Sequence, residues 1–161
     1  PAYANGAPPT AAPADPAWID DQLHDPKARA VLFNGQNLAT DEQGRDMIVP
    51  ARRTRMLPLK RPGLVFLGLM ADTPWFAGTL EDGVAGQGPD FRISAINAEP
   101  DMACIYARAR SLLAWHGRRR YCSNCASEME AQDGGARLKC SGCGMDHFPR
   151  VDPSVRSTAA S

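Results

Sequence analysis

The hydrophobic pattern predicts several short strands in the first half of the chain. Three apolar runs of strand length occur, at Ala30–Phe33, Leu64–Met70 and Pro74–Leu80. The run Leu64–Met70 is the most apolar, which favours a central strand buried in a sheet. Arg55–Leu59 is a further candidate strand. The dipeptide Asn34-Gly35 follows the first run and is a strong signal for a β-hairpin turn.

A short helix is predicted before these strands. Asp15-Pro16 supplies an N-cap side chain and a proline suited to the first turn. Asp25-Pro26 ends the helix. The apolar face consists of Trp18, Ile19 and Leu23.

The period changes from strand to helix at about Pro100. Apolar residues then recur at steps of three and four as far as His116, which predicts one amphipathic helix. Gly117 is predicted to stop this helix, and Arg108 and Arg110 lie away from its stripe. His116 is interpreted as a packing residue near the helix end rather than a catalytic base. The stripe consists of Met102, Ile105, Tyr106, Ala109, Leu112, Leu113 and His116.

Two C-x-x-C pairs carry the strongest chemical signal, Cys122 with Cys125 and Cys140 with Cys143. Each pair places two thiolates on a tight turn, and Zn²⁺ binds four such sulfurs in a tetrahedron at about 2.3 Å. Residues 126–139 separate the pairs, slightly fewer than the usual spacing of about 15–20. The loop between them contains a hairpin signal, Asp133-Gly134-Gly135. The region therefore predicts a zinc ribbon with a closed, structural site.

Other interpretations of the cysteines are weaker. Disulfides need an oxidising compartment, and a thioredoxin-type centre uses one C-x-x-C pair in a βαβ context. His147 could replace a ligand, but four thiolates complete the coordination sphere, so it is interpreted as a neighbour. Cys104 has no partner spacing and is predicted to be a small buried apolar residue.

Composition narrows the classes of function. The chain has 18 basic and 18 acidic residues and a formal net charge of zero, which argues against a general nucleic-acid binder. No apolar run approaches the roughly 18 residues that a membrane helix needs. The Pro/Ala-rich start lacks the pattern of a secretory signal, so the cytoplasm is the expected location. Because Pro1 stands where methionine would, a fragment or processed form is expected.

These elements predict an α+β fold: a small mixed N-terminal domain, a connecting helix and a C-terminal zinc ribbon with four cysteine ligands. The expected parts are a disordered Pro/Ala-rich segment over 1–15, the α+β domain over 16–98, the connecting helix over 99–117, the ribbon over 118–153 and a tail over 154–161.

Several strings of residues resemble a known family. They are Leu112-Leu113-Ala114-Trp115-His116, Arg120-Tyr121-Cys122, the remaining cysteines, Phe148-Pro149-Arg150-Val151-Asp152-Pro153 and, earlier, Val65–Leu69 followed by Trp75-Phe76-Ala77. Together they resemble NADH pyrophosphatases, which are Nudix hydrolases with an N-terminal α+β domain, a zinc ribbon and a catalytic domain.

The resemblance implies an activity and a binding residue. The family hydrolyses NAD(H) to nicotinamide mononucleotide and AMP with Mg²⁺ or Mn²⁺, and it works as a homodimer. Phe148 holds the place of an aromatic that lines the nucleotide site across the dimer. A ring there can stack on a base or on nicotinamide, an interaction worth about 1–3 kcal/mol per base in other sites. The alternative is that Phe148 packs the ribbon onto its neighbour.

The family's catalytic signature does not occur in these 161 residues. That signature, G-x5-E-x7-R-E-U-x-E-E-x-G-U, places glutamates on one helix to hold Mg²⁺ against a pyrophosphate. No two glutamates here are adjacent, and the tail after Pro153 departs from the family pattern. The sequence therefore predicts a non-catalytic front part of the enzyme, inactive alone, that binds structural zinc and forms part of a dimer interface and of the substrate wall. The glutamates are Glu42, Glu81, Glu99, Glu128 and Glu130.

An alternative function is a stand-alone zinc-ribbon module that binds nucleic acid or protein through Arg118–Arg120 and Tyr121. Zero net charge counts against nucleic acid as the partner, and a run of arginines also suits a helix C-terminus.

Overall fold

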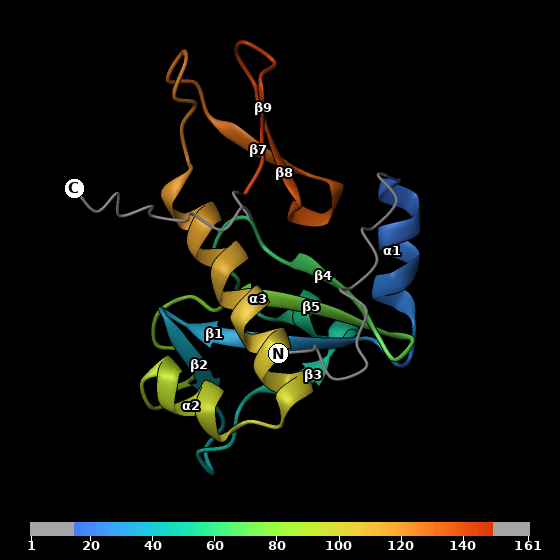
Figure 1. Ribbon diagram of the computed structural model, residues 1–161, viewed down its shortest axis with the longest axis vertical. Coiled ribbons are helices and arrows are strands. Elements are labelled where there is room, and N and C mark those ends of the chain that lie inside the picture. Colours follow the sequence, from blue (N-terminus) through green and yellow to red (C-terminus); the bar gives the residue numbers. More distant parts are fainter. Residues whose placement is uncertain (1–14, 150–161) are drawn as a thin grey trace, which may run out of the picture.

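The structure is a computed structural model that describes residues 15–149 and has a mixed helix and sheet fold (Figure 1). Two sheets are present in this part of the chain, a larger one in the N-terminal domain and a smaller one in the ribbon. The helices are α1 (Pro16–His24), α2 (Phe91–Asn97), α3 (Pro100–Arg118) and the 3₁₀ turns η1 (Ala51–Met56) and η2 (Asp133–Gly135). The strands are β1 (Arg29–Asn34), β2 (Asn37–Thr40), β3 (Ile48–Pro50), β4 (Val65–Met70), β5 (Thr73–Thr79), β6 (Gly86–Gln87), β7 (Met129–Gln132), β8 (Arg137–Cys140) and β9 (Asp146–His147).

The larger sheet is organised around β1. Its strand order is β4-β5-β1-β2-β6, with β3 also paired to β1. Strands β1 and β5 are parallel, and the other pairs are antiparallel. The predicted hairpin at Asn34-Gly35 is confirmed, because β1 turns directly into β2 with Gly35 at a φ of 62°.

Both faces of β1 are covered, which explains its continuous apolar run. On one face, Val31 and Phe33 pack with Ile105 and Leu112 of α3. On the other face, Ala30 belongs to a second core. Helices α3 and α1 therefore lie on opposite sides of the sheet (Figure 1). The second core consists of Ile19, Ala28, Ala30, Ala51, Phe66 and Phe76, with Trp18 and Leu23 against it.

The two predicted helices are confirmed, with one difference at a terminus. Asp15 caps α1 by accepting a hydrogen bond from the N–H of Ala17 at 2.9 Å, and Asp25 is its C-cap. Helix α3 continues through Gly117 to Arg118. The expected stop at Gly117 is therefore wrong, because the N–H of Arg119 closes the last turn on the His116 carbonyl at 3.2 Å.

Two strand expectations need correction. The segment around Arg55 is not a strand, since η1 occupies Ala51–Met56 and the Thr54 hydroxyl closes it on the Ala51 carbonyl at 2.6 Å. Strand β4 exists, but it lies at an edge of the sheet and not at its centre. Its apolarity reflects burial on both faces: Val65 and Leu67 face α3, and Phe66 faces α1.

The segment between β5 and α3 was only partly predicted. The glycine-containing segment over 81–90 contains the two-residue strand β6, which pairs with β2. Helix α2 was missed, and none of its residues is buried. Cys104 was expected to be buried but is exposed, because it lies beside the apolar stripe of α3 and not within it.

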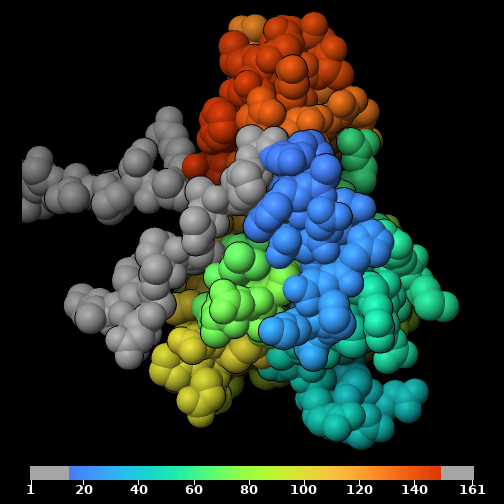
Figure 2. Space-filling model, turned by 90° about the vertical axis from the view of Figure 1, so that its right-hand side faces the viewer, coloured from blue at the N-terminus to red at the C-terminus, as the bar shows by residue number. Residues whose placement is uncertain are grey.

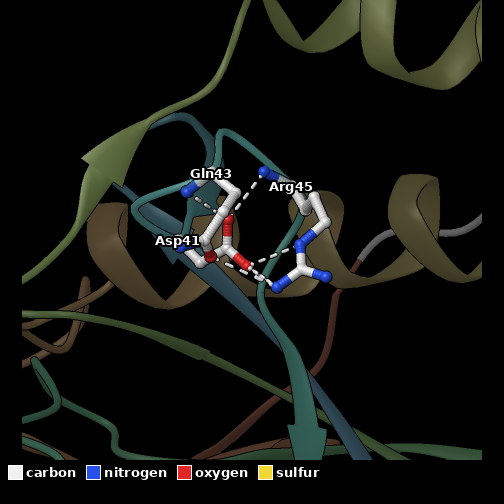
Figure 3. A network of polar contacts seen from close by, with 3 residues as sticks. All are labelled: Asp41, Gln43 and Arg45. Atoms are coloured by element: carbon white, nitrogen blue, oxygen red, sulfur yellow. Dashed lines mark hydrogen bonds and ion pairs between the residues drawn. The ribbon is translucent and has the colours of Figure 1, made fainter.

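The loop from β2 to β3 is closed by one carboxylate (Figure 3). Asp41 accepts hydrogen bonds from the backbone N–H groups of Gln43 and Arg45 at 2.9 Å, and from the Arg45 Nε at 2.9 Å. The hydrogen bond from the Arg45 N–H is the main cause that lowers the pKa of Asp41. These local polar contacts shape the first part of the loop, whereas at its end Asp46 accepts a hydrogen bond from the Tyr106 hydroxyl at 2.8 Å and Met47 packs against Leu32, Ala39 and Leu80.

Helix α3 ends beside the ribbon, whose sheet has the order β7-β8-β9 and sits at one end of the molecule, above α1 in Figure 2. The expected unstructured segment over 1–15 lies outside the described residues except for Asp15, and Arg150, Val151, Asp152, Pro153 and the tail also lie outside them. Within residues 15–149, no helix has the length and apolarity needed to cross a membrane.

Candidate metal centre and the adjoining hollow

The first cysteine turn, residues 122–127, precedes β7. The N–H of Cys122 donates to the Ser127 carbonyl at 2.8 Å, and the N–H of Ala126 returns to the Cys122 carbonyl at 2.9 Å. Ala126 therefore adopts a φ of 60°, which is in the left-handed region. The N–H of Asn124 points at the Cys122 sulfur at 3.4 Å.

The second cysteine turn, residues 140–145, repeats the conformation of the first at the end of β8. The N–H of Cys140 donates to the Met145 carbonyl at 2.9 Å, and the N–H of Gly144 returns to the Cys140 carbonyl at 3.1 Å. Gly144, with a φ of 73°, takes the place that Ala126 has in the first turn. The N–H groups of Gly142 and Cys143 point at the Cys140 sulfur, each at 3.4 Å.

The two turns bring the four thiols together. Their sulfur atoms lie within 4.8 Å of one another, with Cys122 to Cys143 at 3.7 Å and Cys125 to Cys140 at 3.4 Å. A tetrahedron with bonds of about 2.3 Å has sulfur–sulfur edges of about 3.8 Å, so the set fits a four-coordinate metal ion. The distances are too long for disulfides, which measure about 2.0 Å. These four cysteines could hold a metal ion, as the sequence predicted.

The surroundings favour a thiolate at one ligand. Hydrogen bonds from the side chain and backbone of Ser127 lower the pKa of Cys125 to about 6. A side chain at Gly142 would collide with Ser127, so glycine is needed for the two turns to approach. His147 lies beside the cluster, with Nε2 at 3.6 Å from the Cys122 sulfur, as expected of a neighbour.

The ribbon is attached to the N-terminal domain through its own hairpin turn. The predicted turn at Asp133-Gly134-Gly135 is confirmed as η2, with φ values of 62° and 91° at the two glycines. A Cβ at Gly135 would lie 2.6 Å from Val65 Cγ1. The backbone of this turn therefore packs directly against the Val65 side chain of β4. The contact requires glycine both for its φ and for lack of a side chain.

His116 holds this turn from the α3 side. It is 7% exposed, and its Nε2 donates to the Gly135 carbonyl at 2.8 Å. Burial lowers the pKa of His116, and the hydrogen bond to Gly135 opposes that shift. The expected packing role is confirmed. The neighbouring Trp115 packs on the ribbon core of Cys122, Met129, Leu138 and Cys140.

Phe148 lies at the rim of a hollow of about 680 Å³ between the end of α3 and the end of the ribbon. It is 64% exposed, so within the described residues it does not pack the ribbon onto a neighbour. We call this site the Phe148 hollow; it is lined by Ser111, Trp115, Arg118, Arg119, Asp146, His147 and Phe148.

Arg120 belongs to a different arrangement. It pairs with Glu128 at 3.2 Å and lies over the ring of Tyr121 at 5.4 Å. Of the three consecutive arginines, only Arg118 and Arg119 line the Phe148 hollow. Sequence reasoning did not find Arg61, which reaches the Met129 carbonyl of the ribbon at 3.5 Å from the loop before β4. No local signal connects a loop arginine to a carbonyl 68 residues away.

Comparison with known proteins decides the family. Residues 27–115 match the family described as "NADH pyrophosphatase-like rudimentary NUDIX domain". The chain belongs to this family. The match covers more than half of the chain and extends from the start of β1 through most of α3, so the expected family is confirmed at the N-terminal domain.

Curated relatives extend the comparison over short stretches. The NAD-capped RNA hydrolase NudC of Stutzerimonas stutzeri is 33% identical over 57 residues, which are 35% of this chain and 21% of that protein. NudC of Pseudomonas aeruginosa is 32% identical over 60 residues, 37% of this chain and 22% of that protein. The human NAD-capped RNA hydrolase NUDT12 is 36% identical over 61 residues, 33% of this chain and 13% of that protein. The matched part therefore spans about a fifth of the NudC proteins.

Proposed function

We propose that this chain is the zinc-binding, non-catalytic part of an enzyme that hydrolyses NAD(H), free or as the cap of RNA. The observation that carries the proposal is the four-cysteine cluster beside the Phe148 hollow, in a chain of the NADH pyrophosphatase-like family. The names of the NudC and NUDT12 relatives support NAD-capped RNA as a substrate class.

The metal that fits the four thiols is Zn²⁺, with Cys122, Cys125, Cys140 and Cys143 as its ligands. Four thiolates leave no open position for water, so the ion would cross-link the two cysteine turns rather than activate a nucleophile. Because such sites need reduced thiols, we assign the chain to the cytoplasm. Mass spectrometry of the native, reduced protein should find one zinc per chain, and a metal-free folded ribbon would contradict the assignment.

Phe148 forms one wall of the nucleotide site in this proposal. Its exposed ring can stack on nicotinamide or adenine, and Arg118 and Arg119 supply positive charge for the pyrophosphate. Trp115 lines the same hollow and gives a direct readout, since bound NADH should quench its fluorescence. Phe148→Ala should weaken NADH binding by about 1–3 kcal/mol. Phe148→Tyr keeps the ring and should bind NADH like the wild type. Equal NADH affinity of the wild type, Phe148→Ala and Phe148→Tyr would show that Phe148 does not contact the nucleotide.

Pyrophosphate cleavage is assigned to the Mg²⁺- or Mn²⁺-dependent catalytic Nudix domain of the parent enzyme. A divalent ion must stabilise the charge and activate water, and the five glutamates here do not form the Nudix pattern. The 161-residue chain incubated with NADH and Mn²⁺ should produce no AMP above background by chromatography. AMP production that is lost in Asp152→Asn would reveal a catalytic site in this chain.

The same exposed surface supports a homodimer. Tyr121, Met145 and Phe148 of the ribbon are 54%, 44% and 64% exposed, and exposed apolar side chains promote association where they form a patch. Light scattering should find dimers, and Phe148→Ala with Met145→Ala should shift them toward monomer. Met56→Ala is the control, because Met56 is 88% exposed in η1 and far from the ribbon in sequence.

The domain boundaries follow the same proposal. We assign residues 16–98 to the α+β domain, 99–118 to the connecting helix, which ends at Arg118, and 119–153 to the ribbon. Limited proteolysis should cut first near residues 118–121, between α3 and the first cysteine turn.

A further inference from the structure

A second groove lies on the other side of the α3 C-terminus. It has a volume of about 450 Å³ and is enclosed by the β1–β2 turn, the end of β5, the loop before β4 and one face of α3. We call it the Arg110 groove. Its lining residues are Phe33, Gly35, Gln36, Lys60, Arg61, Thr79, Arg110, Leu113, Ala114, Gly117 and Arg118.

The charged side chains that line this groove are all basic. Lys60, Arg61, Arg110 and Arg118 line it, and no acidic residue among residues 15–149 does. The acids that pair with two of these cations are exposed: Asp82 is 84% exposed beside Lys60, and Glu128 lies 3.8 Å from Arg61. Exposed ion pairs of this kind contribute about 0–1 kcal/mol, so a phosphate can replace them. The zero net charge of the chain hides this local concentration.

Arg110 is held in a fixed orientation at the wall of the groove. Its guanidinium lies over the Phe91 ring at 5.2 Å, and its Nη2 donates to the Gln36 side chain at 2.9 Å. Its Nε is buried and has no hydrogen-bond partner within the described residues. A guanidinium that is oriented but only partly hydrogen-bonded is prepared to bind an anion.

The Arg110 groove and the Phe148 hollow share a lining residue. Arg118 borders both sites, so a chain of phosphates could pass from one to the other around the end of α3. Cations along a groove with an exposed aromatic at one end are the pattern of single-strand binding sites.

We propose that the Arg110 groove binds the phosphodiester backbone of the single-stranded RNA that follows an NAD cap held at Phe148. The inference rests on the proposed function for the place of the cap. Lys60, Arg61 and Arg110 are positioning residues for the RNA and contact phosphates, not bases. Binding in the groove therefore depends on salt and little on RNA sequence.

The test uses the full chain, a fluorescein-labelled, uncapped single-stranded RNA and fluorescence anisotropy over a series of salt concentrations. The variant is Lys60→Gln with Arg110→Gln. Each lost phosphate contact lowers the salt slope by about 0.7, so the slope should fall by about 1.4 and affinity at low salt roughly tenfold. The control is Arg52→Gln with Arg53→Gln, which removes the same charge from η1, on the α1 side of the sheet.

The control should bind RNA like the wild type. A groove variant with the affinity and salt slope of the control would overturn the proposal, as would a wild-type chain that does not bind RNA at low salt. Lys60→Gln alone keeps the Arg110 contacts and should give about half of the slope change. This single variant controls for misfolding of the double variant. An NADH titration separates the two proposals. If the chain binds RNA through the groove but does not bind NADH, the proposed cap site at Phe148 is wrong and the proposal for the groove stands.

Discussion

The N-terminal domain and the ribbon have very different cores. The larger sheet buries apolar side chains on both faces, under α3 and under α1. The ribbon core consists of Cys122, Met129, Leu138 and Cys140, with Trp115 of α3 against it. Modules of this size rarely fold on their own apolar surface. The comparison indicates that packing maintains the first region, whereas the second depends on its docking to the first and on the proposed metal cross-link.

The largest predicted effect is the unfolding of the ribbon while the N-terminal domain stays folded. Cys140→Ser, at a position 2% exposed, removes a ligand from the four-thiol set. Structural zinc supplies about 10–16 kcal/mol of apparent binding energy in comparable peptides, so the ribbon should unfold. Hydrogen exchange should show fast exchange for amides of β7 and β8 and continued protection for β1 and β5. Protected ribbon amides in Cys140→Ser would mean that docking suffices without the metal.

The second prediction concerns a substitution that destabilises the N-terminal domain. Phe33→Ala, at a position 1% exposed between the sheet and α3, should destabilise the N-terminal domain by about 3–5 kcal/mol. Urea denaturation followed by circular dichroism measures the loss. The metal content per folded chain should stay that of the wild type, since the four cysteine ligands are not members of this core. Loss of metal before unfolding would show that the two regions fold as one unit.

The sequence predicted the ribbon more fully than the contacts that attach it. Cysteine spacing and the turn signal at Asp133 are local, so the grouping of the four thiols and the turn η2 could be predicted from the sequence. The docking of Gly135 on Val65 joins residues far apart in the chain, and only the folded chain reveals it. The same limit explains the error in β4, because apolarity reports burial of both faces and not the place of a strand in a sheet. Helix α2 was missed because it buries no residue.

The third prediction separates docking from both cores. Gly135→Ala places a methyl group 2.6 Å from Val65 Cγ1, at a φ of 91°. The expected loss is about 1–3 kcal/mol, partly from backbone strain and partly from overpacking. Gly83→Ala is the matched control, because Gly83 has a φ of 81° with no atom within 4 Å of the added Cβ. Equal losses in the two variants would assign the whole effect to strain and none to docking.

The fourth prediction concerns the pH dependence of docking. Burial lowers the pKa of His116 below its ordinary value of 6.5, so between the two pKa values the unfolded state binds more protons. The contribution of His116 to stability is therefore complete above about pH 6.5 and is lost as the pH falls through the folded pKa, at no more than about 1.4 kcal/mol per pH unit. The charged residues that line the hollow beside His116 are Arg61, Arg119, Arg120 and Glu130.

The difference in unfolding free energy between wild type and His116→Gln isolates this effect from titration of the thiols, which both proteins share. That difference should change below about pH 6.5 and stay constant above it. A difference that is constant from about pH 8 to about pH 5 would show that His116 is not buried in its neutral form.

The smallest effect compares the two cysteine turns with each other. Ala126 and Gly144 occupy equivalent places, with φ values of 60° and 73°, and only the second turn has glycine there. The left-handed conformation costs a residue with a Cβ about 1–2 kcal/mol, while glycine loses about 0.5–1 kcal/mol more entropy on folding. Ala126→Gly should therefore stabilise the ribbon by up to about 1 kcal/mol, and Gly144→Ala should destabilise it by a similar amount. Thermal unfolding of the zinc-loaded chains measures both changes. If Ala126→Gly destabilises the ribbon, the first turn does not share the conformation of the second, and the near-symmetry of the metal centre is lost.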